Sequence, residues 1–432
     1  MNSPQNRRRF LATLGLGTAT LAGCMDALGS ADSDENDGEP SGNETDEDEN
    51  GSGNEDGNGN REIVAPAIEA GELVDDFEEI EWNPMYDHTT VSSDDECLVG
   101  ESSMLVESES RDVAGVFRAF SEGQDFFGKD LSFAVRVESP LPARVVLDVR
   151  APGASDRLVS ARSIPGEFDG WLRVEGGYTG KRGEPNLGNV QELRIYVEPR
   201  GDAEGPIRFR IDDLRATERS DQGKVVLTFD DSVESQYTTA LPMLEERGWS
   251  GVAAIIPDSL NQPGRLTINQ CRKLRDAGWD VSAHPHTALP EMDSDERVEY
   301  LQNAHDYIAN RISEDGARHY FAPYNRMDAA SIADVREVFE TSFTFGGQPN
   351  IAPPLDGHML PRVNGHDADD IATLLDLTAE YCQVLTLMVH GVGDTESENS
   401  LNDVTEEDFE AVLDAIESRD LEVVTVSDLV DD

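Results

Sequence analysis

Cysteine is scarce in this chain of 432 residues, which contains only Cys24, Cys97, Cys271 and Cys382. Cys24 belongs to an N-terminal segment of special composition, so three cysteines remain for the rest of the chain. That number allows one bridge at most, which excludes the disulfide framework found in many small secreted domains. The sequence therefore predicts three inert, buried thiols.

Lysine is also scarce. The chain contains 34 Lys and Arg residues, nearly all of them arginine, and 88 Asp and Glu residues. The formal net charge of −54 repels nucleic acid and anionic membrane surfaces, which excludes both as direct partners. The acidic residues continue through the segments expected to fold, so an acidic tail on an ordinary protein does not account for them. Concentrated salt, with a Debye length of about 3 Å, would screen their repulsion. This composition resembles that of proteins from extreme halophiles, especially salt-loving archaea.

The apolar run near the N-terminus, residues 11–22, is too short to cross a bilayer, which takes roughly 20 residues. A charged start, a short apolar run and small residues at its end are typical of a signal peptide. Residues 7–11 resemble a twin-arginine export signal, and residues 21–24 resemble a lipobox. We therefore expect residues 1–23 to be a signal peptide, and Cys24 to anchor the protein by lipid to the extracellular face of the cell membrane. The alternative is a plain secretory peptide with a chance cysteine.

Two regions of different composition follow the signal. Residues 25–62 are mostly Asp, Glu, Gly, Asn and Ser, and we expect a disordered acidic linker because they cannot bury enough apolar surface. Residues 63–218 contain short runs that alternate apolar and polar side chains, such as 131–137 and 193–197. Gly, Pro and Asp separate these runs, which predicts an all-β sandwich. Its first and last segments resemble the terminal strands of galactose-binding-like jelly rolls, the fold of many carbohydrate-binding modules.

Aromatic residues of the sandwich region are candidates for stacking on sugar rings. They are Trp82, Tyr86, Trp171 and Tyr178. Positions in the core or at its rim are the more common place for such residues. The sequence leaves open whether the sandwich binds sugar or serves as a spacer.

The pattern changes to alternating strands and helices over residues 222–432. An apolar strand is expected at 224–229, helical spacing at 237–247 and a second strand at 251–256. Such alternation predicts a parallel sheet covered by helices, and the strand count fits an incomplete (β/α) barrel. Reactive residues of such barrels lie at the C-terminal ends of the strands, where the polar clusters of this region stand.

Acids and histidines follow several of these strands. Asp230 and Asp231 offer one carboxylate for a metal and one for a proton. His284 and His286 lie two residues apart, so on extended backbone both imidazoles can face one ion. Asp231 with two histidines would leave a coordination position open for water, as catalytic Zn²⁺ sites require. His390 ends a later strand, where an imidazole can act as a general acid. The alternatives are a solvated Asp pair, surface histidines and a packing histidine.

Together these residues resemble the NodB-homology polysaccharide deacetylases, carbohydrate esterase family 4, over about half of the chain. The resemblance implies that Asp230 is the catalytic base, Asp231 a metal ligand and His390 the general acid. It also implies that His284 is a metal ligand, and that the backbone N–H of Tyr324 helps to hold the oxyanion.

The sequence departs from the family's pattern at three places. The second metal-binding histidine usually lies four residues after the first, but that position is Ala288, so His286 would have to serve with a shifted loop. The arginine that precedes Pro-Tyr in many members is missing, and Arg362 is our hypothesis for the charge that steadies Asp230. The Asp and Trp of the fourth motif are not evident, which leaves the partner of His390 unidentified.

We therefore expect a hydrolase that removes acetyl groups from an acetylated polysaccharide, with Zn²⁺ or another divalent metal such as Co²⁺ activating water. We expect a monomer; neither the polymer nor the choice between N- and O-deacetylation follows from the sequence. A non-catalytic surface lectin with a degenerate deacetylase fold is the alternative from another class, favoured by the altered second motif. An enzyme acting on another C–N or C–O bond is a further alternative, because a fold does not fix a substrate.

Overall fold

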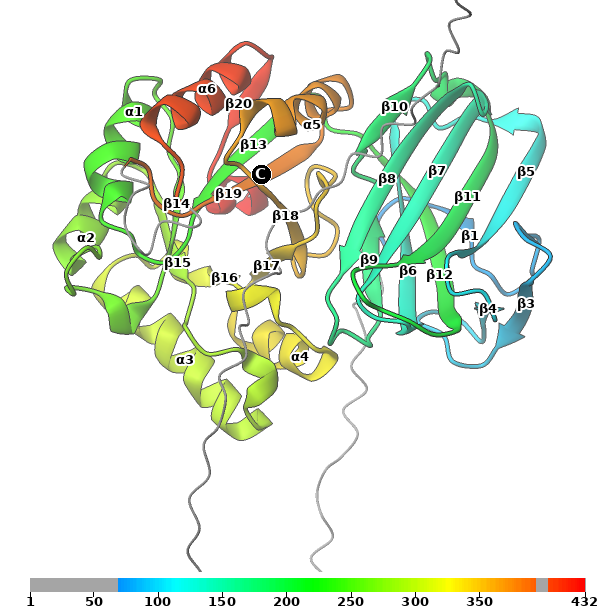
Figure 1. Ribbon diagram of the computed structural model, residues 1–432, viewed down its shortest axis with the longest axis horizontal. Coiled ribbons are helices and arrows are strands. Elements are labelled where there is room, and N and C mark those ends of the chain that lie inside the picture. Colours follow the sequence, from blue (N-terminus) through cyan, green and yellow to red (C-terminus); the bar gives the residue numbers. More distant parts are fainter. Residues whose placement is uncertain (1–68, 394–402, 432) are drawn as a thin grey trace, which may run out of the picture. The chain divides into compact units, whose positions relative to one another are not determined.

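The computed structural model describes residues 69–393 and 403–431. They belong to one compact unit, Arg61–Asp432, with antiparallel sheets in its N-terminal half and a parallel α/β barrel in its C-terminal half (Figure 1). The predicted signal peptide, the anchor at Cys24 and the whole of the expected linker lie outside the described residues. Within the described ranges, no helix is long and apolar enough to cross a membrane.

The N-terminal half consists of two antiparallel sheets. Its strands are β1 (Glu72–Asp75), β2 (Asn83–Pro84), β3 (Thr89–Asp94), β4 (Ser103–Ser108), β5 (Ala114–Gln124), β6 (Lys129–Ser139), β7 (Ala143–Gly153), β8 (Asp156–Ile164), β9 (Leu172–Glu175), β10 (Gly180–Arg182), β11 (Val190–Pro199) and β12 (Ile207–Glu218). One sheet has the order β3-β4-β12-β6-β9, with β1 paired to β12, and the other has the order β10-β8-β7-β11-β5-β2.

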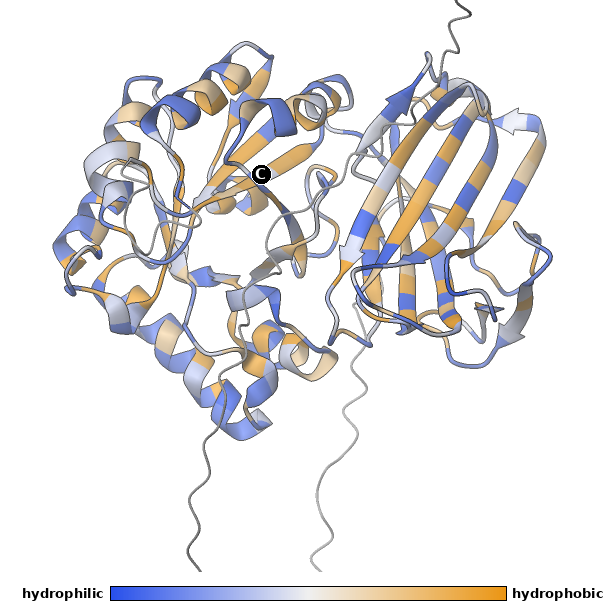
Figure 2. Ribbon diagram, viewed as in Figure 1, coloured by the Kyte–Doolittle hydropathy of each residue, from blue (hydrophilic) through white to orange (hydrophobic). Residues whose placement is uncertain are grey.

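Alternating side chains explain why these segments form sheets with one apolar face. On β7, Val145, Leu147 and Val149 are buried in the core, whereas Arg144 and Arg150 on the opposite face are only half-buried. Figure 2 shows the same alternation as bands of opposite hydropathy along the long strands. The predicted sheet-rich N-terminal region is confirmed, and its jelly-roll connectivity stays a prediction.

The C-terminal half is a ring of parallel strands. The strands are β13 (Gly223–Phe229), β14 (Val252–Ile255), β15 (Asp280–Ala283), β16 (His319–Phe321), β17 (Thr341–Phe345), β18 (Leu360–Asn364), β19 (Val384–Val389) and β20 (Leu421–Val423). They follow the order β14-β15-β16-β17-β18-β19-β13-β20, and an extra pairing of β13 with β14 closes the ring, with β20 outside it. Seven parallel strands in a closed ring confirm the predicted α/β barrel.

Helices lie around the outside of the ring (Figure 1). They are α1 (Leu241–Glu245), α2 (Ile268–Asp276), α3 (Ser294–Arg311), α4 (Ala329–Val338), α5 (Ala368–Glu380), α6 (Glu406–Glu417) and α7 (Val426–Asp431). Several of these helices begin at a polar N-cap residue whose side chain accepts a backbone N–H of the first turn. At the start of α2, Thr267 and Gln270 form a capping box, in which the side chain of each accepts the backbone N–H of the other. Because the helices cover the sheet, β13 is buried at every position.

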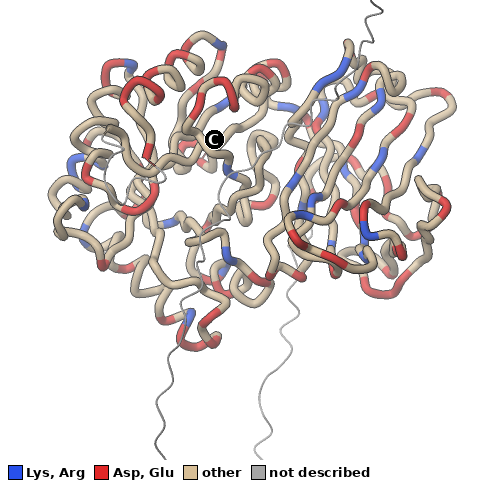
Figure 3. Tube along the Cα trace, viewed as in Figure 1, with Lys and Arg blue, Asp and Glu red and all other residues tan. Residues whose placement is uncertain are grey.

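The acidic residues are spread over both halves (Figure 3). Arginines pair with many of them: Arg210 alone contacts Asp94, Glu96 and Glu138. The acidic excess is therefore a property of the folded surface as well as of the N-terminal segment. The halophilic character that this composition indicates stays a prediction.

The aromatic candidates for sugar stacking are mostly part of the core. Trp82, Trp171 and Tyr178 are buried, and Tyr86 stacks on His88 with 5.2 Å between ring centroids. Buried rings offer no face to a glycan, so these three are structural.

The cysteines of the described chain are free thiols. Cys271 is buried, and burial raises the pKa of its thiol to about 12. Cys97 and Cys382 are only half-buried, so the prediction of three buried thiols is wrong for these two.

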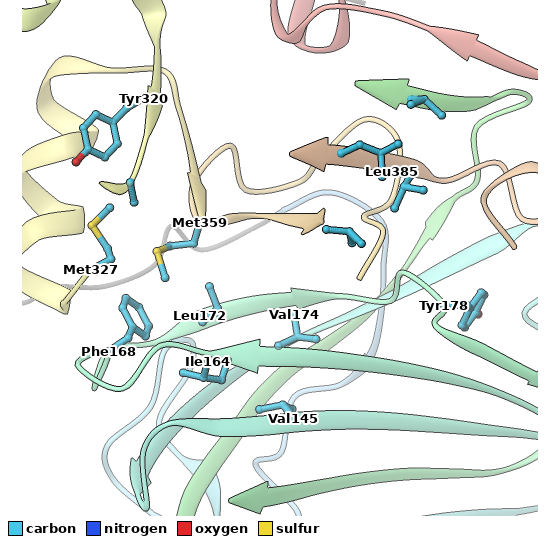
Figure 4. Close-up of a cluster of buried hydrophobic side chains, with 14 of the residues drawn as sticks. Val145, Ile164, Phe168, Leu172, Val174, Tyr178, Tyr320, Met327, Met359 and Leu385 are labelled. Carbon is cyan, nitrogen blue, oxygen red and sulfur yellow. The ribbon is translucent and has the colours of Figure 1, made fainter. Parts of the chain in front are cut away.

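One hydrophobic cluster runs through both halves of the compact unit (Figure 4). Leu172 and Val174 of β9 belong to it together with Met359 and Leu385 from the barrel. This burial removes apolar surface of both halves from water and favours a fixed arrangement over two independent modules.

Gln383, just before β19, adds hydrogen bonds between the halves. It is fully buried, and its side-chain oxygen accepts the N–H of Tyr178 at 3.0 Å. Its amide nitrogen donates to the carbonyl of Gly176 at 3.1 Å. One side chain of the barrel thus satisfies two backbone groups of the sheet region.

We expect Gln383→Ala to destabilise both halves together. The change leaves a buried N–H and a buried C=O without partners, at a cost of about 1–3 kcal/mol each. Calorimetry should show one unfolding transition, shifted to lower temperature. Gln302→Ala, at an exposed position of α3, is the control and should leave the midpoint unchanged. Two separate transitions of which only one moves would contradict this coupling.

Candidate active site

The polar residues of the candidate site stand on the inner face of the barrel strands. A hydrophobic cluster with members on β13, β14, β16, β17, β18 and β19 fills the inside of the ring. Because side chains alternate along a strand, counting in twos from Val226 of this cluster leads to Asp230. The same count on β18 and β19 leads to Arg362 and His390. These side chains meet at the C-terminal end of the ring, which we call the mouth.

Asp230 and Arg362 form a bidentate ion pair at the mouth. The Arg362 Nη1 atom donates to Asp230 Oδ1 at 2.7 Å, and Nη2 donates to Oδ2 at 3.0 Å. Both side chains are 3% exposed. Burial alone would raise the pKa of Asp230, but the guanidinium of Arg362, with the nearby His284 and His390, lowers it to about 2. Asp230 is therefore ionised at neutral pH, and its carboxylate is fixed in orientation.

His284 lies beside both acids. Its Nε2 atom is 3.4 Å from Asp231 Oδ1 and 3.9 Å from Asp230 Oδ2. Its Nδ1 atom is 2.9 Å from the carbonyl oxygen of Phe321, which can only accept, so Nδ1 carries the hydrogen and Nε2 faces the carboxylates. Burial opposes the charged imidazole, but the two carboxylates outweigh burial and raise the pKa of His284.

His286 points elsewhere. Its Nε2 atom is 3.1 Å from the hydroxyl of Tyr324, and the two rings are perpendicular with centroids 5.9 Å apart. In the two described ranges, no group of three or more His, Cys, Asp or Glu side chains is arranged to hold a metal ion. The residues thus do not complete the predicted ligand set of Asp231, His284 and His286. Asp231 and His284 are adjacent, and the third member is engaged with a tyrosine.

Tyr324 stands on a tight turn at the mouth, within Pro323–Asn325. It has φ +54° and Asn325 has φ +56°, a left-handed conformation that non-glycine residues rarely adopt. The side-chain oxygen of Asn325 accepts the N–H of Phe345 at 2.6 Å, which fastens the turn to β17. Backbone strain held in place by such contacts is common at functional sites.

Comparison with known proteins finds a family match for part of this half of the chain. Residues 217–338 match a family model described as polysaccharide deacetylase. These residues are therefore similar to a polysaccharide deacetylase domain. Such a domain indicates a hydrolase of the deacetylase class. A search of curated proteins found no match.

The solved structures that resemble parts of this chain are distant from it. The Xyl-CE4 domain of a multidomain xylanase from the hindgut metagenome of Trinervitermes trinervoides has 15% identity and a TM-score of 0.36, covering 49% of this chain and 91% of its own. The chitin deacetylase of the fungal pathogen Colletotrichum lindemuthianum has 15% identity and a TM-score of 0.33, covering 49% and 89%. A family 11 carbohydrate-binding module of Clostridium thermocellum has 14% identity and a TM-score of 0.27, covering 35% and 96%. Scores of this size do not indicate an activity.

Two residues of the barrel were missed by sequence reasoning. The ring of His366 lies 6.4 Å from that of His390, and one nitrogen of each, Nε2 and Nδ1 respectively, is buried without a hydrogen-bond partner. Burial, with the charge of His390, lowers the pKa of His366 to about 4. Gln236 donates to the carbonyl oxygens of Asp230 at 2.6 Å and His390 at 3.1 Å. The position of His366 just after a strand could have identified it as a site residue from the sequence. No sequence feature marks Gln236 in this way.

We expect Arg362→Ala to destabilise the barrel by about 3–5 kcal/mol, because it leaves the buried carboxylate of Asp230 without its partner. Chemical denaturation at neutral pH measures the loss. The lowered pKa of Asp230 makes the stability of the fold depend on pH. The pair contributes fully above about pH 3.9, the ordinary pKa of Asp, and this contribution is lost as the pH falls toward 2. The difference between wild type and variant should therefore shrink between about pH 4 and pH 2.

Arg111→Ala is the matched control for this loss. Arg111 pairs with Glu204 at 3.6 Å, and both side chains are largely exposed. Exposed pairs contribute about 1 kcal/mol or less, so its removal should cost little. If Arg362→Ala lowered the free energy of unfolding by as little as Arg111→Ala, the buried pair would not stabilise the mouth.

Proposed function

We propose that this domain hydrolyses acetyl groups from an acetylated polysaccharide. The observation that carries the proposal is the fixed, ionised Asp230 at the mouth of a barrel that matches the polysaccharide deacetylase family. His284 and the strand end that carries His390 lie at the same mouth. A carboxylate, imidazoles and a guanidinium in one opening are suited to proton transfer and to charge stabilisation.

The reaction can be written with residues of this chain. Asp230 accepts a proton from a water molecule that attacks the acetyl carbon, and Arg362 holds the carboxylate in place. The backbone N–H of Tyr324 binds the developing oxyanion. His390 gives a proton to the leaving amine or alkoxide, and acetate is released. Which group leaves, nitrogen or oxygen, depends on the polymer.

Metal dependence stays a prediction. Asp231 and His284 offer one oxygen and one nitrogen 3.4 Å apart, and His286 is turned to Tyr324. The arrangement as described falls short of the three side chains that a catalytic Zn²⁺ or Co²⁺ site uses. No step of the proposed reaction is therefore assigned to an ion.

The proposal places the enzyme outside the cell as a lipid-anchored monomer. Its support is the N-terminal sequence, with a twin-arginine-like segment and a lipobox before Cys24. The sheet region would act as a carbohydrate-binding or spacer domain, and its firm packing on the barrel favours the spacer role.

A non-catalytic carbohydrate-binding protein is the second candidate. The incomplete ligand set at His286 favours it, because a site that lost its metal could keep its glycan contacts. The two candidates differ in one observable, the release of acetate.

We expect the wild type to release acetate from at least one acetylated glycan in concentrated salt. A suitable panel contains an N-acetylglucosamine oligomer, acetylated xylan and acetylated exopolysaccharide, with acetate measured enzymatically. Asp230→Asn should lower the rate by about 10²–10⁴-fold, the usual contribution of a positioned general base. Asp306→Asn, at an exposed position of α3, is the control and should keep full activity.

The assay separates the candidates. Binding of a glycan without acetate release by the wild type would support the lectin. Activity retained by Asp230→Asn would refute the role of Asp230, even if acetate is released. Parallel assays with a chelator and with added Zn²⁺ or Co²⁺ report the metal dependence directly.

A further inference from the structure

Exposed aromatic side chains gather at the mouth. In the described parts of the chain, the large hydrophobic residues that are exposed are Leu73, Phe127, Tyr324 and Phe345. Two of these four, Tyr324 and Phe345, stand at the C-terminal ends of the neighbouring strands β16 and β17. Single exposed apolar side chains are normal on a protein surface, but two aromatic residues at the end of a barrel where polar groups meet are candidates for contact with a ligand.

Phe345 belongs to the inner face of the barrel. It lies two residues after Phe343, which stacks on Phe321 inside the ring with centroids 4.6 Å apart. The alternation of β17 therefore turns Phe345 to the same side, and the strand ends there. In the pairing of β17 with β18, Phe345 is the partner of Arg362, which holds Asp230. Phe345, which is 36% exposed, thus stands next to the residue that holds Asp230.

Tyr324 stands at the end of the neighbouring strand β16. Its side chain is 66% exposed, and its hydroxyl is bound to His286 at 3.1 Å. The turn that carries it is fastened to Phe345 through Asn325, at 2.6 Å. Arg326 holds the other end of the turn by contacts with Glu167 and Glu291. The turn and the Tyr324 hydroxyl are therefore held in place before any ligand arrives.

We propose that Phe345 and Tyr324 form a sugar-binding rim for the pyranose unit next to the acetylated one. A pyranose has C–H faces that pack on aromatic rings and hydroxyls that need polar partners. The rim supplies both kinds of contact, because the Tyr324 hydroxyl and the His286 imidazole stand beside the rings. The rim deepens the proposed function, on which it rests: it explains how a polymer is held while one acetyl group reaches Asp230.

The test compares a substrate that reaches the rim with one that does not. Phe345→Ala should raise the KM for a tetramer of N-acetylglucosamine or of acetylated xylose about five- to tenfold, the size expected for one lost aromatic contact, and leave kcat within about twofold. With 4-nitrophenyl acetate, which lacks a second sugar unit, kcat/KM should stay within about twofold. Phe345→Tyr keeps the ring and should restore the KM. Phe127→Ala removes an exposed ring of the sheet region and should change nothing.

Direct binding separates failure of the rim from failure of the proposed hydrolysis. Titration calorimetry with the full-length Asp230→Asn protein and the same tetramers measures affinity without turnover. Affinity that falls about five- to tenfold on adding Phe345→Ala supports the rim even if the wild type releases no acetate. Unchanged KM and affinity in the Phe345→Ala variants, or no binding of either tetramer, would overturn it. A loss of 4-nitrophenyl acetate hydrolysis as large as the loss on the tetramer would also overturn it, because the ring would then support the catalytic groups instead of the sugar.

Discussion

The ion pair of Asp230 and Arg362 is the contact on which the arrangement of the mouth depends. Both groups are buried, and neither could stay charged there without the other. Their positions follow from the barrel, because β13 and β18 present them on the inner face at the same end of the ring. The pair keeps the carboxylate ionised and fixed in orientation at the mouth.

The neighbours of this pair set what the opening can do. His284 has its Nε2 atom toward both carboxylates because the carbonyl of Phe321 takes its other nitrogen. A tight turn at Tyr324 exposes the tyrosine ring, and Phe345 adds a second ring from the next strand. Charged groups therefore lie inside the mouth, and two exposed aromatic residues lie at its edge.

Much of this site could be predicted from the sequence, and the reasons for the limits are physical. The strand before Asp230 and the later strand ends were visible as apolar runs, and parallel strands bring their ends together. The partner of Asp230 was predicted only as a hypothesis, since Arg362 is distant in sequence and its pairing depends on barrel register. The orientation of His286 depends on a loop conformation that spacing does not determine.

Other features had no local signal at all. The pairing of His366 with His390 arises from two loops on adjacent strands, and Phe345 reads as an ordinary strand residue until the inner face is known. The hydrogen bonds of Gln383 to the sheet region also join residues that are far apart in the sequence. Alternation and composition identify the elements, whereas contacts between elements need the fold.

A crystal structure of the protein with bound acetate, the expected product, would test the account most directly. It should show acetate in the mouth between Asp230 and His390, with one oxygen on the Tyr324 N–H and the Arg362 pair intact. Acetate bound elsewhere, or Asp230 turned away from Arg362 with the mouth empty, would contradict the account.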